Sequence, residues 1–160
     1  MSTINYNSNN DLDLDGKLML SVGGEPIAFA TSAKLTVTTE MVDTTNMMSG
    51  DWKDEVTGVK SFTTSSEALL SRKAGVVSAE SLLDSQLSDS LLDFVFGEYK
   101  RTGDETAGYT YDLDTTKTSY TGKIRITSLD LTGENSKLKK YTMNANGCGP
   151  LKKTAGVPGV

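Results

Sequence analysis

The chain has 160 residues, of which 36% are hydrophobic and 23% charged, and this suits one globular domain of ordinary size. Its formal net charge of −5 argues against a protein built to hold nucleic acid tightly, because such binding depends on clustered Lys and Arg. The sequence contains no histidine, which removes the commonest catalytic base and metal ligand, so we expect no enzyme, metal or cofactor. The single cysteine, Cys148, cannot form an internal disulfide.

Residues 1–15 are rich in Asn, Ser and Asp and predict an N-terminal arm that orders only against a partner. Asp11, Asp13 and Asp15 resemble the start of a calcium-binding loop, but Val22 stands where that loop needs a bidentate Glu, which favours a solvated acidic arm. The stretch has no signal-peptide pattern, and no apolar run has the length of a membrane span. We therefore expect synthesis in the cytoplasm and no contact with a membrane.

The first regular elements are strands. Apolar and polar residues alternate over Lys17–Val22, and a glycine pair at Gly23–Gly24 predicts a tight turn into a second strand over Ile27–Thr31. Ala33–Thr39 alternates in the same way and predicts a half-buried strand. The domain therefore begins with three strands.

The next segment, Glu40–Gly58, has no clear periodicity and is predicted to be a long loop. It carries Met41, Met47, Met48 and Trp52, whose side chains are costly to leave in water. Tryptophan is also enriched at the centres of protein interfaces. The loop is therefore predicted to form a contact surface.

A strand over Val59–Glu67 precedes the one predicted helix, Ala79–Phe94. Apolar residues recur there at three or four positions, namely Leu83, Leu87, Leu91 and Phe94. Ser78 is the expected N-cap. Because the end of this helix overlaps an apolar run, we expect a strand to begin at about Val95 and to reach Arg101.

After a polar turn, Tyr109–Asp114 is a possible strand, and Thr118–Lys152 predicts a long hairpin with its turn at Gly133–Ser136. In the first arm of this hairpin the apolar alternation slips by one residue near Thr127. Such a slip indicates either a β-bulge or a strand that passes from one packing environment to another. The second arm alternates an apolar face with a long polar face, which needs water.

The segment VDTTNMMSGDWKDEVTGVKSFTTSSEALL, Val42–Leu70, resembles the loop-and-strand block of phage major tail tube proteins. The Asp- and Thr-rich loop of that block falls on Asp43 and Thr44, and its Trp and Gly fall on Trp52 and Gly58. The stretches SYTGKIRITSLDLTG and GCGPL are similar to the closing hairpin of that family, and GKLMLSVGG to its first strand. The three blocks follow one another in the order of the family.

The resemblance implies a mainly β protein, a β-sandwich or barrel with one flanking helix over residues 79–94 and a long loop over residues 40–58. Residues 16–151 would form a single tail tube domain, and residues 152–160 a C-terminal tail. Such proteins stack as hexameric rings into a hollow tube in the virion tail, which conducts DNA out of the capsid without binding it tightly. Sheath, tape-measure and tail terminator proteins are further partners, and synthesis takes place in the host bacterial cytoplasm.

Two sets of contact residues follow from this resemblance. Intersubunit or ring-stacking contacts are expected at Asp43, Thr44, Met47, Met48 and Trp52. The closing hairpin is expected to be an assembly element, in which a strand passes from the subunit core to the tube wall, through Ile124, Ile126, Thr127, Leu129, Tyr141 and Met143. Two alternatives stay open: the inner tube of a non-phage contractile injection system, and a carbohydrate-binding or adhesin β-sandwich with polar strands and a single tryptophan.

Overall fold

The computed structural model describes residues 17–27, 29–71 and 77–157. The protein is mainly β, as predicted, and α2, Ala79–Leu87, is the one helix among the described residues. The strands are β1 Lys17–Val22, β2 Glu25–Pro26, β3 Ala30–Asp43, β4 Glu55–Leu69, β5 Leu92–Asp104, β6 Gly108–Leu113, β7 Ser119–Thr132, β8 Lys140–Gly147 and β9 Lys152–Thr154. The predicted N-terminal arm, with its aspartates, lies outside the described residues. No helix in the described part of the chain is long and apolar enough to cross a membrane.

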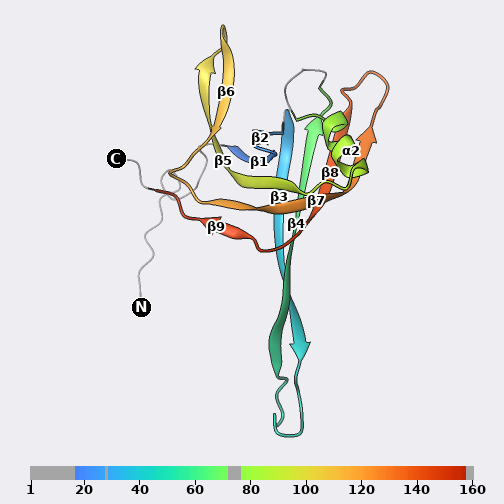
Figure 1. The fold of residues 1–160 in the computed structure, drawn as a ribbon, viewed down its shortest axis with the longest axis vertical. Coiled ribbons are helices and arrows are strands. Elements are labelled where there is room, and N and C mark those ends of the chain that lie inside the picture. Colours follow the sequence, from blue (N-terminus) through green and yellow to red (C-terminus); the bar gives the residue numbers. More distant parts are fainter. Residues whose placement is uncertain (1–16, 28, 72–76, 158–160) are drawn as a thin grey trace.

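All the strands belong to one antiparallel sheet with the order β2-β1-β5-β7-β8-β4-β3. In addition β6 pairs with β5, and β9 pairs with β7. The sheet is strongly bent, so that β3 and β4 cross β5 and β7 steeply in Figure 1. Near the two ends of the strand order, β1 and β3 also contact each other. The sheet therefore curls around its core like a partly closed barrel.

The core lies on the inner side of this curl. It is built from the apolar positions of the alternating strands, including Leu20, Phe94, Ile124, Tyr141 and Met143. Helix α2 packs against β7 and inserts Leu82 into the same cluster. Phe62 lies 5.4 Å from Phe94 between ring centroids, and a Cβ atom at Gly147 would overlap the Phe62 ring. The absence of a side chain at Gly147 thus makes room for the aromatic pair.

The predicted helix over residues 79–94 is too long. Helix α2 ends at Leu87, Asp89 adopts a left-handed conformation with φ 54°, and β5 begins at Leu92. The hydroxyl oxygens of Ser88 and Ser90 lie 2.7 Å apart at this point, and serine and aspartate favour such local contacts over helix. The apolar spacing continues past Leu87 only because the alternating residues of β5 follow.

The N-terminal end of α2 agrees with the prediction. Ser78 is the N-cap, in an extended conformation, and its N–H donates to the Ser81 hydroxyl at 3.0 Å. Glu80 lies in the first turn, where the helix dipole favours negative charge.

The predicted loop over residues 40–58 is also wrong in extent. Strand β3 continues to Asp43 and β4 starts at Glu55, so only residues 44–54 form the loop. The register shifts beyond Thr39, where Gly58 and Val59 lie opposite the single residue Glu40, which is a β-bulge. This part of the hairpin is solvated on both faces, and so it lacks the alternation that marks a half-buried strand.

Two shorter segments also differ from the prediction. Ile27 forms an isolated parallel bridge with Val77, and the next strand begins only at Ala30. Lys152–Thr154, assigned to a C-terminal tail, form strand β9 and pair with Ser119–Thr121 of β7. The sheet therefore extends beyond the predicted boundary of the domain.

The closing hairpin is present as β7 and β8, and the phase slip near Thr127 is a register shift between Ile126 and Ser128. Thr127 is the extra residue on β7, and its hydroxyl donates to the Asn144 carbonyl at 3.1 Å. The bulge therefore accounts for the slip within one hairpin.

Candidate assembly interface

The β3–β4 hairpin extends far beyond the core and ends in loop 44–54 (Figure 1). Strand β8 pairs with β4 only over Thr63–Leu69, so the earlier residues of β4 have β3 as their only strand partner. None of residues 40–59 is buried. We call residues 40–59 the arm and residues 44–54 its tip loop.

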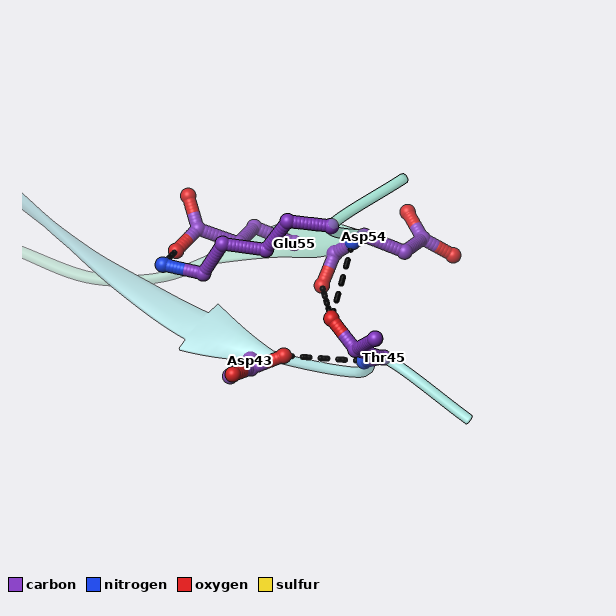
Figure 2. Close-up of polar contacts among 5 residues, drawn as sticks. Asp43, Thr45, Asp54 and Glu55 are labelled. Atoms are coloured by element: carbon purple, nitrogen blue, oxygen red, sulfur yellow. Dashed lines mark hydrogen bonds and ion pairs between the residues drawn. The ribbon is translucent and has the colours of Figure 1, made fainter. Parts of the chain in front are cut away.

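The base of the tip loop is closed by hydrogen bonds around Thr45, which Figure 2 shows. The Thr45 hydroxyl accepts the Asp54 N–H at 2.9 Å and lies 3.2 Å from the Asp54 carbonyl, while Thr44 N–H donates to that carbonyl at 2.9 Å. The Asp43 carboxylate accepts the Thr45 N–H at 2.9 Å. The Thr45 hydroxyl and this N–H lower the pKa of Asp43. The loop thus keeps the strand ends together without any core behind it.

The turn of the tip loop is organised by Asn46. Its side-chain oxygen accepts the Met48 N–H at 2.8 Å, and its amide nitrogen donates to the Thr44 carbonyl at 3.0 Å. Its backbone N–H donates to the Ser49 hydroxyl at 3.1 Å, and its carbonyl accepts the Ser49 N–H at 2.9 Å. Gly50 follows with a positive φ of 69°, which glycine adopts at little cost. Four polar contacts on one residue give the tip loop a defined shape.

This ordered loop presents three large apolar side chains to solvent. Their relative exposures are 101% for Met47, 94% for Met48 and 83% for Trp52. Large apolar side chains are costly to leave in water, so their exposure on a defined turn is typical of a preformed binding surface. Met47, Met48 and Trp52 are therefore exposed and close in sequence, as an interface requires.

Sequence reasoning missed Thr45 and Asn46, which carry the hydrogen bonds of the loop. Their signal was present, since Asn and Thr at adjacent positions are typical of side-chain-capped turns. Of the other predicted contact residues, Asp43 is exposed at the end of β3, and Thr44 contributes its backbone N–H and carbonyl to the loop.

Most of the second predicted set lies inside the subunit. The side chains of Ile124, Ile126, Tyr141 and Met143 belong to the core of a single subunit and are not available as contacts between subunits. Strand β7 pairs with β5 on one edge as far as Ile124 and with β9 and β8 on the other, and beyond Ile124 its strand partner is β8. After the bulge, Leu129 and Leu131 lie opposite Met143 and Tyr141, and Leu131 is 59% exposed. Of this set, Thr127 is exposed and Leu129 half-buried.

The outer face of the same strands is polar over its whole width. Residues in register across β3, β4, β8 and β7 share this face in three rows, Ser32, Glu67, Thr142 and Asp130, then Lys34, Ser65, Asn144 and Ser128, then Thr36, Thr63, Asn146 and Arg125. The Asn144 amide donates to the Ser128 hydroxyl at 2.9 Å. We call these three rows the polar face. Within the described residues, no group of three or more Cys, Asp and Glu comes together as a metal site.

Comparison with known proteins gives three results. The family model described as phage tail tube protein matches residues 18–153. A comparison with curated protein sequences finds no match. Several solved structures are similar in fold, and all of those reported below have low sequence identity.

A chain from the virion of a native gene transfer agent particle is 19% identical, with a TM-score of 0.66, and the match covers 86% of this chain and 95% of that chain. The SPP1 tail tube is 7% identical, with a TM-score of 0.58 and coverages of 88% and 78%. The sheath/tube terminator of the extracellular contractile injection system PVC is 14% identical, with a TM-score of 0.61 and coverages of 96% and 100%. These structural similarities show a shared fold. The family model matches the sequence itself, over most of the chain. The chain therefore belongs to the phage tail tube protein family and is a structural protein of the virion tail.

Proposed function

We propose that this chain assembles as hexameric rings, which stack into a hollow tube that conducts DNA out of the capsid. The observation that carries the proposal is the tip loop, which is held in shape by its own hydrogen bonds and yet leaves Met47, Met48 and Trp52 in solvent. Burying these side chains against another copy would recover about 1.5 to 3 kcal/mol for each. In a ring of six subunits, six such loops act together.

The polar face is the surface that we assign to the lumen of the tube. Its hydroxyl and amide groups stay hydrated and offer no apolar surface to which DNA bases could bind. Its charges are mixed, because Glu67 and Asp130 lie in the first row, Lys34 in the second and Arg125 in the third. A wall without a basic stripe holds few phosphates, so DNA can slide along it.

Three kinds of partner belong to this proposal. A tape-measure protein would occupy the lumen during assembly, a tail terminator would close one end of the tube, and a sheath would surround it in a contractile tail. The inner tube of a non-phage contractile injection system is the second candidate, and it is favoured by the fold similarity to the PVC sheath/tube terminator. Particles that carry this chain but no DNA would favour that alternative.

Trp52→Ala tests the proposed function. The purified wild-type protein is expected to form rings and stacked tubes in negative-stain electron microscopy, whereas Trp52→Ala is expected to form few tubes or none. The melting temperature of the unassembled subunit should change by less than about 2 °C, because surface substitutions alter stability by about 0.5 kcal/mol or less and Trp52 is 83% exposed.

Trp52→Phe is the matched control, since it keeps an aromatic ring at this position and should retain most of the assembly. A wild-type protein that stays monomeric at high concentration would overturn the proposal. If such a monomer bound glycans, the carbohydrate-binding sandwich would become the leading interpretation. Normal tubes formed by Trp52→Ala would show that this side chain does not anchor the interface.

A further inference from the structure

The end of the molecule opposite to the arm, where β4 and β7 end and β8 begins (Figure 1), carries a second set of exposed apolar residues. Its leucines are exposed by 40% at Leu70, 59% at Leu131 and 73% at Leu138. The backbone segments that carry the three leucines are neighbours. Leu131 lies opposite Tyr141 across β7 and β8. The Leu70 N–H donates to the carbonyl of Lys139, the residue after Leu138, at 2.8 Å. We call these three residues the leucine patch.

Helix α2 extends this surface. It packs against β7, and the Gln86 amide donates to the Thr127 carbonyl at 3.3 Å, four residues before Leu131. Its exposed leucines are Leu83, at 38%, and Leu87, at 75%. A helix end and three strand ends thus present leucine side chains to solvent on one side of the subunit, as Figure 1 shows for the elements that carry them.

The two ends of the molecule differ in charge. The tip loop and the residues that flank it carry Asp43, Asp51, Asp54 and Glu55 against a single lysine, Lys53, which pairs with Glu55. The turn between β7 and β8, together with the first residue of β8, carries Lys137, Lys139 and Lys140 against Glu134. Lys137 pairs with Glu134, and Lys140 lies 3.5 Å from Glu67 of β4. An acidic apolar tip and a basic apolar patch are complementary surfaces.

We propose that the tip loop of one copy docks on the leucine patch of a second copy in the next ring, with Met47, Met48 and Trp52 against the leucines and Asp51 and Asp54 toward Lys137 and Lys139. This inference rests on the proposed function, because it names the surface that receives the arm. The contact is heterologous, since two different surfaces of the same chain meet. A heterologous contact between opposite ends does not close on itself, and so it produces an open stack of rings.

The other prominent projection of the subunit is less suited to receive the tip loop. The β5–β6 hairpin also extends from the body (Figure 1), but its exposed Tyr109 is covered on one ring face by Arg101, whose guanidinium carbon lies 4.3 Å from the ring centroid. The apolar surface of this hairpin is therefore partly occupied within the subunit. The leucine patch offers more apolar surface and the charge opposite to that of the tip.

Disulfide trapping tests the docking. In a Cys148→Ser background, Met48→Cys combined with Leu138→Cys should, on treatment of assembled tubes with an oxidant, give a ladder of covalent multimers on a non-reducing gel. The ladder is expected because each copy is linked to one copy above and one below. The matched control is Met48→Cys with Thr106→Cys, which moves the second thiol to the β5–β6 turn and should give no ladder.

Charge reversal provides a second test, in a chain without the introduced cysteines, and its readout is the critical concentration for tube formation. Lys139→Glu should raise the critical concentration for tube formation about tenfold, and Asp51→Lys in the same chain should restore it, because attraction between the two ends is then re-established in reverse. Lys100→Glu, an exposed lysine on β5, is the control and should leave the critical concentration within about twofold.

The outcomes separate the two proposals. Tubes that form normally but cross-link only through Thr106→Cys, or not at all, would overturn the docking and leave the tube function intact. Tubes whose critical concentration is raised by Lys139→Glu but is not restored by Asp51→Lys would also overturn it. A wild-type chain that forms no tubes would overturn the proposed function itself.

Discussion

The buried hydroxyl group of Tyr141 lowers the stability of the folded subunit. The residue is 1% exposed, and the hydroxyl oxygen has no hydrogen-bond partner among the described residues. Burial raises the pKa of Tyr141 to about 12. An unsatisfied buried hydroxyl costs about 1 to 3 kcal/mol relative to a hydrated one, so this side chain stabilises the core through its ring alone.

Tyr141→Phe is therefore expected to raise the free energy of unfolding at pH 7 by about 1 kcal/mol, measured by urea denaturation. Above pH 10 the unfolded tyrosine loses its proton while the folded one keeps it, so the wild-type subunit binds more protons when folded and loses stability as pH rises toward 12. The variant should show a shallower loss. Tyr99→Phe is the control: the Tyr99 hydroxyl is hydrogen-bonded to Ser21, and its removal should destabilise the subunit by about 1 kcal/mol. Equal effects of the two substitutions would contradict this account.

At the residue scale, the sequence predicted which side chains are exposed at the arm but not what holds them there. Met47, Met48 and Trp52 stand out by type, because large apolar residues in a polar segment indicate a contact. The roles of Thr45 and Asn46 depend on the register of β3 and β4, which brings Asp54 within 2.9 Å of Thr45. Such a long-range pairing cannot be read from the local sequence.

At the scale of elements, the arm is separable from the core. Thr39 lies opposite Lys60, and none of residues 40–59 between them is buried. The arm therefore adds little apolar burial to the subunit, because even its more covered apolar side chains, such as Val42 at 45%, are about half exposed. The paired residues on the core side of Thr39, such as Val37 and Phe62, remain in place. A fold with an arm of this kind keeps its stability and its assembly surface in different segments.

Replacing residues 40–59 by Asn-Gly is expected to give a folded subunit that does not form tubes. A two-residue Asn-Gly turn suits a hairpin whose strands are already in register, and the change removes a long loop whose closure costs entropy. The melting temperature should stay within about 4 °C of the wild type. Circular dichroism and analytical ultracentrifugation provide the measurements, and a loss of the folded β spectrum would show that the arm supports the core.

The elements that sequence predicted well are those with one buried face. The hairpin of β7 and β8 follows the alternation, and even the slip at Thr127 corresponds to a real bulge. The arm was predicted as a loop because both of its faces are in water, so its periodicity carries no information. A bulge and a change of environment produce the same pattern in a sequence, so the slip at Thr127 could not reveal that Ile124 and Met143 lie in the subunit core.

At the scale of the whole molecule, the subunit has two different ends. The arm with its acidic tip lies at one end, and the leucine patch with the lysine-rich turn lies at the other. A subunit with unlike ends has a direction, and a stack built from it has two unlike ends as well. One end of the tube would present arms and the other would present leucine patches, so each end requires a different closing partner.

This polarity predicts that the variant lacking the arm blocks growth from one side. It keeps the leucine patch and can receive an arm from a wild-type ring, but it cannot itself dock on a further ring. Mixing about one variant subunit per ring with the wild type is therefore expected to shorten the tubes severalfold in electron micrographs, because every ring that contains the variant lacks part of one stacking surface. Leu138→Asp should shorten them as well, by weakening the opposite surface. If stacking joined two arms instead, Leu138→Asp would leave tube length unchanged, and the directional model of the tube would fail.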